Sequence, residues 1–198
     1  MENNATKIAV LVSGGGSNLQ SIIDAIKHKE LDATIELVIS SNSKAYALER
    51  AKQHNIKSYV VSKKDFSNPS DEILKIVNQH HVELIILAGY LGILNGRLLN
   101  EYQNKIINIH PALLPKFGGA GMYGHHVHEA VIKANEHESG ATVHYVDEKV
   151  DGGNIILQVK VPVLNDDTPD ALAKRVLEQE HKILPKAIKL TIAKLHSN

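Results

Sequence analysis

Short apolar runs alternate with amphipathic segments along the first half of the chain. Runs such as Lys7–Ser13 and Leu84–Ala88 are almost wholly apolar, which is typical of strands buried on both faces of a parallel sheet. After the first run, Leu19, Ile22 and Ile26 recur at the spacing of one helical face. Strands are predicted over Lys7–Ser13, Thr34–Ser40, Lys57–Val61, Leu84–Ala88 and Lys105–His110, with helices around 19–26, from about Lys44 to His54 and over Pro69–His80.

The pattern changes after Pro111. A glycine-rich stretch, Phe117–Gly124, leads into a helix, two further strands and a last helix that Thr168 caps. We therefore expect one domain over residues 1–198, a Rossmann-like three-layer α/β fold whose mostly parallel sheet carries an antiparallel C-terminal addition. The later elements are expected from about His125 to Asn135, over Ala141–Val146, over Ile155–Val161 and from Pro169 onward.

The composition excludes several kinds of chemistry and partner. Lys and Arg number 22 and Asp and Glu number 22, so the net charge is zero and nucleic acid is not an expected partner. The absence of cysteine excludes disulfides, zinc thiolate sites and thiol nucleophiles. The N-terminus is polar, and no run approaches the ~18 apolar residues of a membrane span. A cytoplasmic location without membrane contact is expected.

A glycine-rich loop follows the first predicted strand. Gly14–Gly16, Ser17 and Asn18 lie where the first helix begins, and backbone N–H groups at a helix N-terminus bind anions. The loop therefore predicts a phosphate site. A dinucleotide site is disfavoured because Leu19 replaces the third glycine of that motif, and no lysine completes a P-loop. The alternative is a plain turn in which Ser17 caps the helix and Gln20 completes a capping box.

Two polar side chains stand at the end of the fifth predicted strand. Asn108 and His110 are two residues apart, so both project to one face of the strand, at the sheet edge where open parallel sheets bind ligands. Asp151 lies in the loop between the last two strands, and a carboxylate near His110 would fix its tautomer and raise its pKa. The alternatives are a core histidine satisfied by a neighbour and an aspartate that stabilises its own turn.

Glu180 falls on the apolar stripe of the last helix, beside Val176 and Ile183. A buried carboxylate needs a partner, so the position predicts a ligand contact, an internal pair with Lys or Arg, or a solvated groove edge. Three histidines, His125, His126 and His128, open the preceding helix, but no further ligand stands at zincin spacing. We expect no metal there and interpret these histidines as helix caps or as lining of the glycine-rich loop.

Four motifs stand in order along the chain: Ser13–Leu19, Asn108–Pro115, Thr142–Val146 and Val150–Gly153. Together they closely resemble the phosphoribosylglycinamide formyltransferases, which are folate-dependent enzymes of purine synthesis. The resemblance covers about residues 6–190 and implies a metal-free transfer of the formyl group of 10-formyltetrahydrofolate to the amine of glycinamide ribonucleotide. It also implies a nucleotide-phosphate half at about 1–100 and a folate and catalytic half at about 101–198, in a monomer or a homodimer.

The resemblance assigns roles residue by residue. Asn108, His110 and Asp151 would be the catalytic set, with His144 in support, Leu114–Pro115 as a cis peptide bond that aims the loop, and His125 as a possible binding residue. The nucleotide would be held by Gly16, Ser17, Asn18 and Glu180, with its phosphate on the loop and its amine on the glutamate. The folate pocket would be lined by Leu91, Gly92, Ile93, Leu94, Asp147, Glu148, Lys149 and Val150.

Other functions are weighed against this one. Formylation of initiator tRNA needs a basic surface and a further domain, whereas this chain carries zero net charge. Formyltetrahydrofolate hydrolysis is expected to need an added N-terminal domain, for which the residues before Lys7 leave no room. A nucleotide-binding module would have no reason to place Asn108, His110 and Asp151 together.

The chain departs from many relatives at two positions where they carry arginine, one in the segment after the fourth predicted strand and one that serves the glutamate tail of the folate. These segments read Leu91–Leu94 and Ser67–Ser70 here, so tail recognition falls to Lys63, Lys64 or Lys116. The 117–128 loop is also longer than in many relatives.

Overall fold

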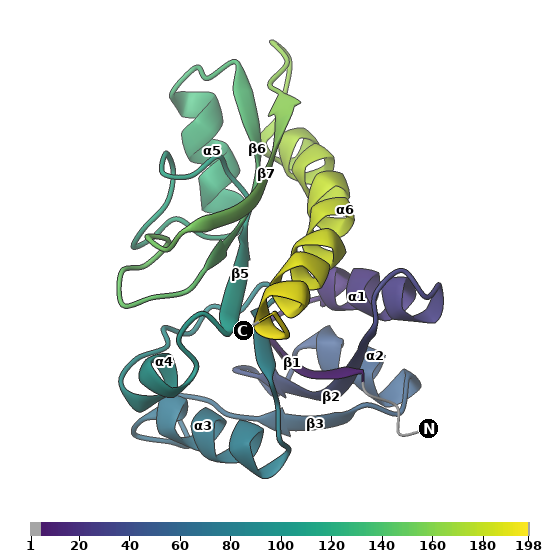
Figure 1. The fold of residues 1–198 in the computed structure, drawn as a ribbon. Coiled ribbons are helices and arrows are strands. Elements are labelled where there is room, and N and C mark those ends of the chain that lie inside the picture. Colours follow the sequence, from purple (N-terminus) through teal and green to yellow (C-terminus); the bar gives the residue numbers. More distant parts are fainter. Residues whose placement is uncertain (1–4, 198) are drawn as a thin grey trace.

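Seven strands form one mixed sheet in the computed structural model, which describes residues 5–197 (Figure 1). Their order across the sheet is β3-β2-β1-β4-β5-β6-β7. The first five strands in this order run parallel, while β6 pairs antiparallel with β5 and with β7. The predicted parallel sheet with an antiparallel C-terminal addition is confirmed.

The element bounds agree closely with the sequence pattern. The strands are β1 Thr6–Val12, β2 Ala33–Ser40, β3 Lys57–Val60, β4 Leu84–Leu87, β5 Ile106–His110, β6 Glu138–Tyr145 and β7 Ile155–Pro162. The helices are α1 Ser17–Lys27, α2 Tyr46–Gln53, α3 Pro69–Gln79, α4 Arg97–Glu101, α5 His125–Lys133 and α6 Pro169–Leu195. The five-residue helix α4 was not predicted, because so short a segment shows no helical period.

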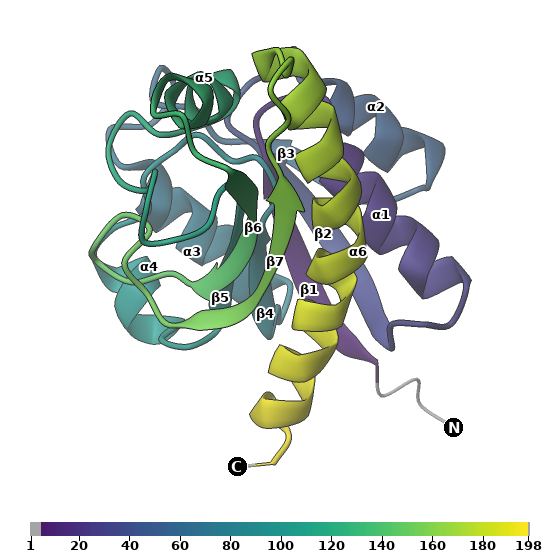
Figure 2. The same cartoon turned by 90° about the horizontal axis from the view of Figure 1, so that it is seen from above.

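Helices cover both faces of the sheet, and this explains the continuous apolar runs. Successive side chains of a strand point to opposite faces, so Val10 enters the core beneath α1, α2 and α6, while Leu11 enters the core beneath α3 and α4. Figure 2 shows α1 and α6 on one side of the sheet and α3 and α4 on the other. The three-layer prediction is therefore confirmed.

The last helix starts as the sequence predicts. Thr168 is the N-cap, and its Oγ1 accepts a hydrogen bond from the Ala171 N–H at 3.2 Å. Pro169 occupies the first turn, where its missing N–H costs no hydrogen bond. Among residues 5–197, no helix combines the length and the apolar character needed to cross a bilayer.

Candidate active site

Strands β1, β4 and β5 end at the same edge of the sheet, and the loops that follow them surround two adjoining cavities. The first has a volume of about 300 Å³ and the second about 460 Å³. Both are lined by Gly89, Leu91, Ile109, Pro111 and Gly124. The predicted site residues other than Pro115 divide between the two cavities.

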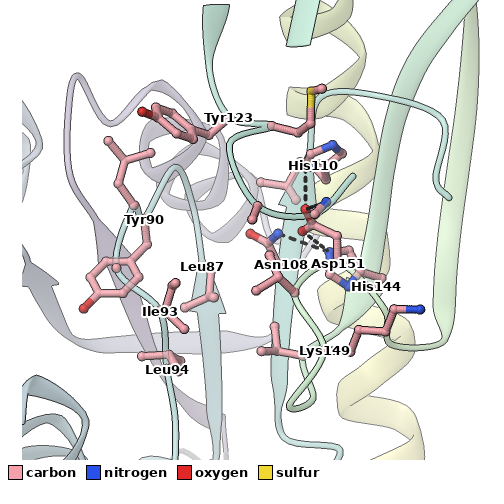
Figure 3. A pocket seen from close by; sticks show the side chains of 18 of the residues that line it. Leu87, Tyr90, Ile93, Leu94, Asn108, His110, Tyr123, His144, Lys149 and Asp151 are labelled. Atoms are coloured by element: carbon pink, nitrogen blue, oxygen red, sulfur yellow. Dashed lines mark hydrogen bonds and ion pairs between the residues drawn. The ribbon is translucent and has the colours of Figure 1, made fainter. Parts of the chain in front are cut away.

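Asn108, His110, His144 and Asp151 meet in the first cavity, as Figure 3 shows. The His110 Nδ1 lies 3.6 Å from the Asp151 Oδ2, and the His144 Nε2 lies 3.5 Å from the Asp151 Oδ1. His110 is 3% exposed, and the Asp151 side chain is also largely buried. The two side chains therefore face each other inside a cavity, which is the arrangement that the predicted catalytic pair requires.

His144 connects Asn108 to the rest of this group. The antiparallel register of β5 and β6 places His144 directly opposite Asn108. The His144 Nδ1 donates to the Tyr145 carbonyl at 2.8 Å, which leaves Nε2 to accept from the Asn108 Nδ2 at 3.1 Å. The second N–H of the Asn108 amide is then available to an acceptor in the cavity.

The backbone of the glycine-rich stretch Phe117–Gly124 hydrogen-bonds both His110 and Asp151. The sequence did not predict these contacts. The His110 Nε2 donates to the Phe117 carbonyl at 2.8 Å, and the Gly119 N–H donates to the Asp151 Oδ2 at 2.9 Å. Phe117 has a φ of +54°, a conformation that bulky side chains rarely adopt. The change of sequence pattern after Pro111 indicated that this segment differs from the preceding ones. The contact between the Phe117 carbonyl and His110 could not be predicted from it, because that contact depends on the path of the folded loop.

Burial and charge act in opposite directions on the pair. Burial lowers the pKa of the His110 imidazole below its ordinary value and outweighs the opposing effects of Asp151 and the Phe117 carbonyl. The carboxylate acts on this pKa in the predicted direction, but burial, which that prediction did not include, makes the net shift a decrease. Burial also raises the pKa of the Asp151 carboxyl, but the neighbouring His144 and His110 and the Gly119 N–H together hold it below its usual range.

The predicted folate-lining residues surround the first cavity. Leu91 and Ile93 are about 60% exposed at its rim, and Leu94 is buried in its wall. Figure 3 shows Ile93 and Leu94 across the cavity from Asn108, with Lys149 below the catalytic group. The remaining predicted residues of this wall are Gly92, Asp147, Glu148 and Val150, and all line the cavity.

The glycine-rich loop after β1 lines the second cavity and starts α1. Gly16 is the N-cap of α1 with a φ of +72°, and a Cβ built on it would lie 2.7 Å from the Ala47 Cβ. Only glycine fits this position. The alternative of a Ser17 cap with a Gln20 capping box is wrong, because α1 already includes Ser17 and the Gln20 side chain bonds Asp24 and Arg50 instead.

Glu180 faces the same cavity and has no basic partner among the described residues. Its Oε2 accepts a hydrogen bond of 2.6 Å from the Asn18 Nδ2, and the Asn18 Oδ1 is buried without a partner among residues 5–197. Burial raises the pKa of the Glu180 carboxyl, and Asn18 only partly opposes this effect. The alternative of an internal Lys or Arg pair is therefore wrong.

The profile of the formyl transferase family matches residues 6–188. The chain belongs to this family. The phosphoribosylglycinamide formyltransferase of Haemophilus influenzae is 45% identical over 186 residues, which are 92% of this chain and 85% of the relative. Glycinamide ribonucleotide transformylase 1 from Symbiobacterium toebii shares the fold with a TM-score of 0.89 at 35% identity, over 96% of this chain and 88% of that chain. A formyltetrahydrofolate deformylase from Pseudomonas syringae is similar with a TM-score of 0.86 at 28% identity, over 98% of this chain and 62% of that chain.

Two other predicted positions of this formyl transferase are the Leu114–Pro115 bond and His125. The Leu114–Pro115 bond is cis, as predicted, and Gln158 and Thr142 hydrogen-bond the Leu114 backbone. His125 lines the second cavity at its mouth and lies 3.5 Å from Asp170. Within residues 5–197 no three His, Cys, Asp or Glu side chains are grouped as a metal site.

The lysines proposed for the folate tail do not share one location. Lys63 and Lys64 line a third cavity of about 530 Å³, whose wall of Tyr90–Ile93 also borders the first cavity. Lys116 instead lies outside these cavities and pairs with Glu136 at 3.0 Å. Of the three lysines proposed for the tail, Lys63 and Lys64 are therefore the two placed near the first cavity.

Proposed function

We propose that this formyl transferase moves the formyl group of 10-formyltetrahydrofolate to the amine of glycinamide ribonucleotide, giving formylglycinamide ribonucleotide and tetrahydrofolate. One observation carries the proposal: the cavity lined by the loop of residues 13–18 adjoins the cavity in which Asn108, His110 and Asp151 converge. A nucleotide in one and a folate in the other bring the amine and the formyl carbon together at these side chains. The relatives carry names that state this activity.

The nucleotide occupies the second cavity in this proposal. Its phosphate accepts hydrogen bonds from the backbone N–H groups of Gly16, Ser17 and Asn18 at the start of α1, where the helix dipole favours an anion. The buried, unpaired Glu180 carboxylate attracts the amine, since a cationic or hydrogen-bond-donating group is the partner it lacks. The residues of both halves of the chain contribute to each cavity.

The reaction forms one C–N bond and breaks another. The amine attacks the formyl carbon, and the carbonyl oxygen becomes an oxyanion. The free Asn108 N–H donates to that oxyanion, an effect worth about 3–4 kcal/mol for a well-placed donor, and the positive charge of a protonated His110 stabilises it further. The developing negative charge favours the imidazolium and so opposes the effect of burial on His110.

Collapse of the intermediate then expels the folate nitrogen. The attacking nitrogen loses one proton and the folate N10 gains one, so the overall charge is conserved. Asp151 is the carboxylate closest to His110. It supports the proton transfer by orienting the imidazole and by transiently accepting the proton. No covalent enzyme intermediate is required.

The folate runs along the wall that Leu91–Leu94 and Asp147–Val150 form in the first cavity. Its acidic tail extends toward Lys63 and Lys64, because their cavity lies across the shared wall of Tyr90–Ile93. This placement is supported by charge complementarity between the two lysines and a tail carboxylate.

A spectrophotometric assay of tetrahydrofolate release from a 10-formyl folate analogue tests the proposal. We expect release to depend strictly on added glycinamide ribonucleotide. The similarity to a deformylase makes hydrolysis the second candidate, and release at the same rate without the nucleotide would establish it instead.

A further inference from the structure

His128 is a buried histidine of the second cavity to which the mechanism gives no role. It lies in α5, is 4% exposed and lines the cavity together with Asn18 and Glu180. Its Nδ1 is buried without a hydrogen-bond partner among residues 5–197. A buried polar atom without a partner costs free energy, so its presence beside a cavity points to a ligand that completes it.

The imidazole of His128 is uncharged at neutral pH. Burial lowers its pKa to about 4, and the neighbouring His125 and His110 act in the same direction. A neutral imidazole has one donor nitrogen and one acceptor nitrogen. It is therefore suited to an uncharged polar group rather than to a phosphate, which prefers a cation, or to an ammonium, which prefers a carboxylate.

The cavity restricts which part of the nucleotide meets His128. In the proposed function the loop of residues 13–18 binds the phosphate, and Glu180 binds the amine. The sugar joins these two groups, and its hydroxyls both donate and accept, so they match either tautomer of the imidazole. His125 and Lys174 also line the cavity, and the buried Asn18 Oδ1 is an acceptor only.

Resting on the proposed function, we propose that His128 is a substrate-binding residue that hydrogen-bonds a sugar hydroxyl of the nucleotide. The contact fixes the sugar between its phosphate and its amine, and so sets how far the amine reaches toward Asn108 and His110. His128 thereby selects a ribose phosphate over inorganic phosphate.

Calorimetric titration with inorganic phosphate, ribose 5-phosphate and glycinamide ribonucleotide tests this role. His128→Leu is expected to weaken the binding of both sugar phosphates about tenfold, which corresponds to about 1.4 kcal/mol. Binding of inorganic phosphate should be unchanged. An amide restores the contact at one nitrogen position, because Asn places it near Nδ1 and Gln near Nε2, so one of these two variants should bind nearly as the wild type does.

The matched control is His126→Leu on the same helix, whose side chain is 61% exposed and contacts Glu129. This variant should bind all three ligands normally. Unchanged sugar-phosphate binding in His128→Leu overturns the proposal, and so does an equal loss in the Leu, Asn and Gln variants, which would indicate packing alone. If the Leu variant does not fold, the contrast between Asn and Gln decides the question.

Binding and turnover separate the two proposals. A wild type that binds ribose 5-phosphate through His128 but never formylates glycinamide ribonucleotide refutes the proposed function and leaves the sugar contact standing. A wild type that formylates the nucleotide while all His128 variants bind it normally refutes only the sugar contact.

Discussion

Replacing Glu180 with Gln is expected to stabilise the folded protein while weakening its binding of the nucleotide. The Glu180 side chain is 7% exposed and its one protein partner in the described chain is the neutral Asn18 amide. Burial raises the pKa of the carboxyl, so the ionised form is disfavoured in the folded state. Gln has the same shape, and its Oε1 accepts the same hydrogen bond without a charge.

The sign of the effect on stability follows from proton binding. A carboxyl with a higher pKa in the folded than in the unfolded chain binds more protons when folded, so stability falls as pH rises above its unfolded pKa. The amide does not titrate. The gain from Glu180→Gln is therefore small below about pH 4, where both states hold the proton, and is complete only above the folded pKa.

The expected magnitude is about 0.5–2 kcal/mol at neutral pH, as is common when a functional site is relieved of an unfavourable group. For a chain of this length, roughly 2–4 °C in Tm corresponds to each kcal/mol. Loss of a charge-assisted contact to the amine should raise the Kd of the nucleotide by about ten- to a hundredfold.

Thermal unfolding across pH, with calorimetric titration of glycinamide ribonucleotide, measures both effects. The matched control is Glu178→Gln, two residues away on the exposed face of α6, which should change neither quantity. A Tm equal to or below that of the wild type at neutral pH would refute the reasoning that Glu180 is a buried carboxylate without a stabilising partner.

Three further substitutions probe the other parts of the site. Asp151→Asn should lower kcat by about 10²–10⁴-fold. The variant lacks the charge that opposes the effect of burial on the pKa of His110, so the fall in rate with rising pH should move to lower pH. An unchanged pH profile would contradict the pairing of His110 with Asp151. Gly16→Ala should destabilise the fold by about 1–3 kcal/mol in thermal unfolding, since its φ is +72° and the added Cβ meets Ala47. Arg50→Lys loses the 2.8 Å hydrogen bond from the Arg50 Nε to the Gly15 carbonyl. The Kd of inorganic phosphate should therefore rise about fivefold, or about 1 kcal/mol. Equal binding would exclude a role of Arg50 in positioning the loop.

The order of the elements and the face of each strand could be predicted because they are local properties. Continuous apolar runs such as Leu84–Leu87 have one stable outcome, a strand covered by helices on both sides. Strand alternation likewise places Asn108 and His110 on the same face. The glycine run Gly14–Gly16 marks the start of α1, although not which residue caps it.

The sequence by itself determined the sheet, its helical layers and the candidates for chemistry, since side-chain period and turn chemistry act over a few residues. Only the tertiary structure decided how those candidates meet. Asp151 reaches His110 because β6 and β7 return along β5, and Phe117 reaches the same ring through a loop whose path no local pattern specifies. Burial also depends on the tertiary structure, because every neighbouring element contributes to it. The net pKa shift of His110 and the lack of a basic partner for Glu180 therefore appeared only in the folded chain.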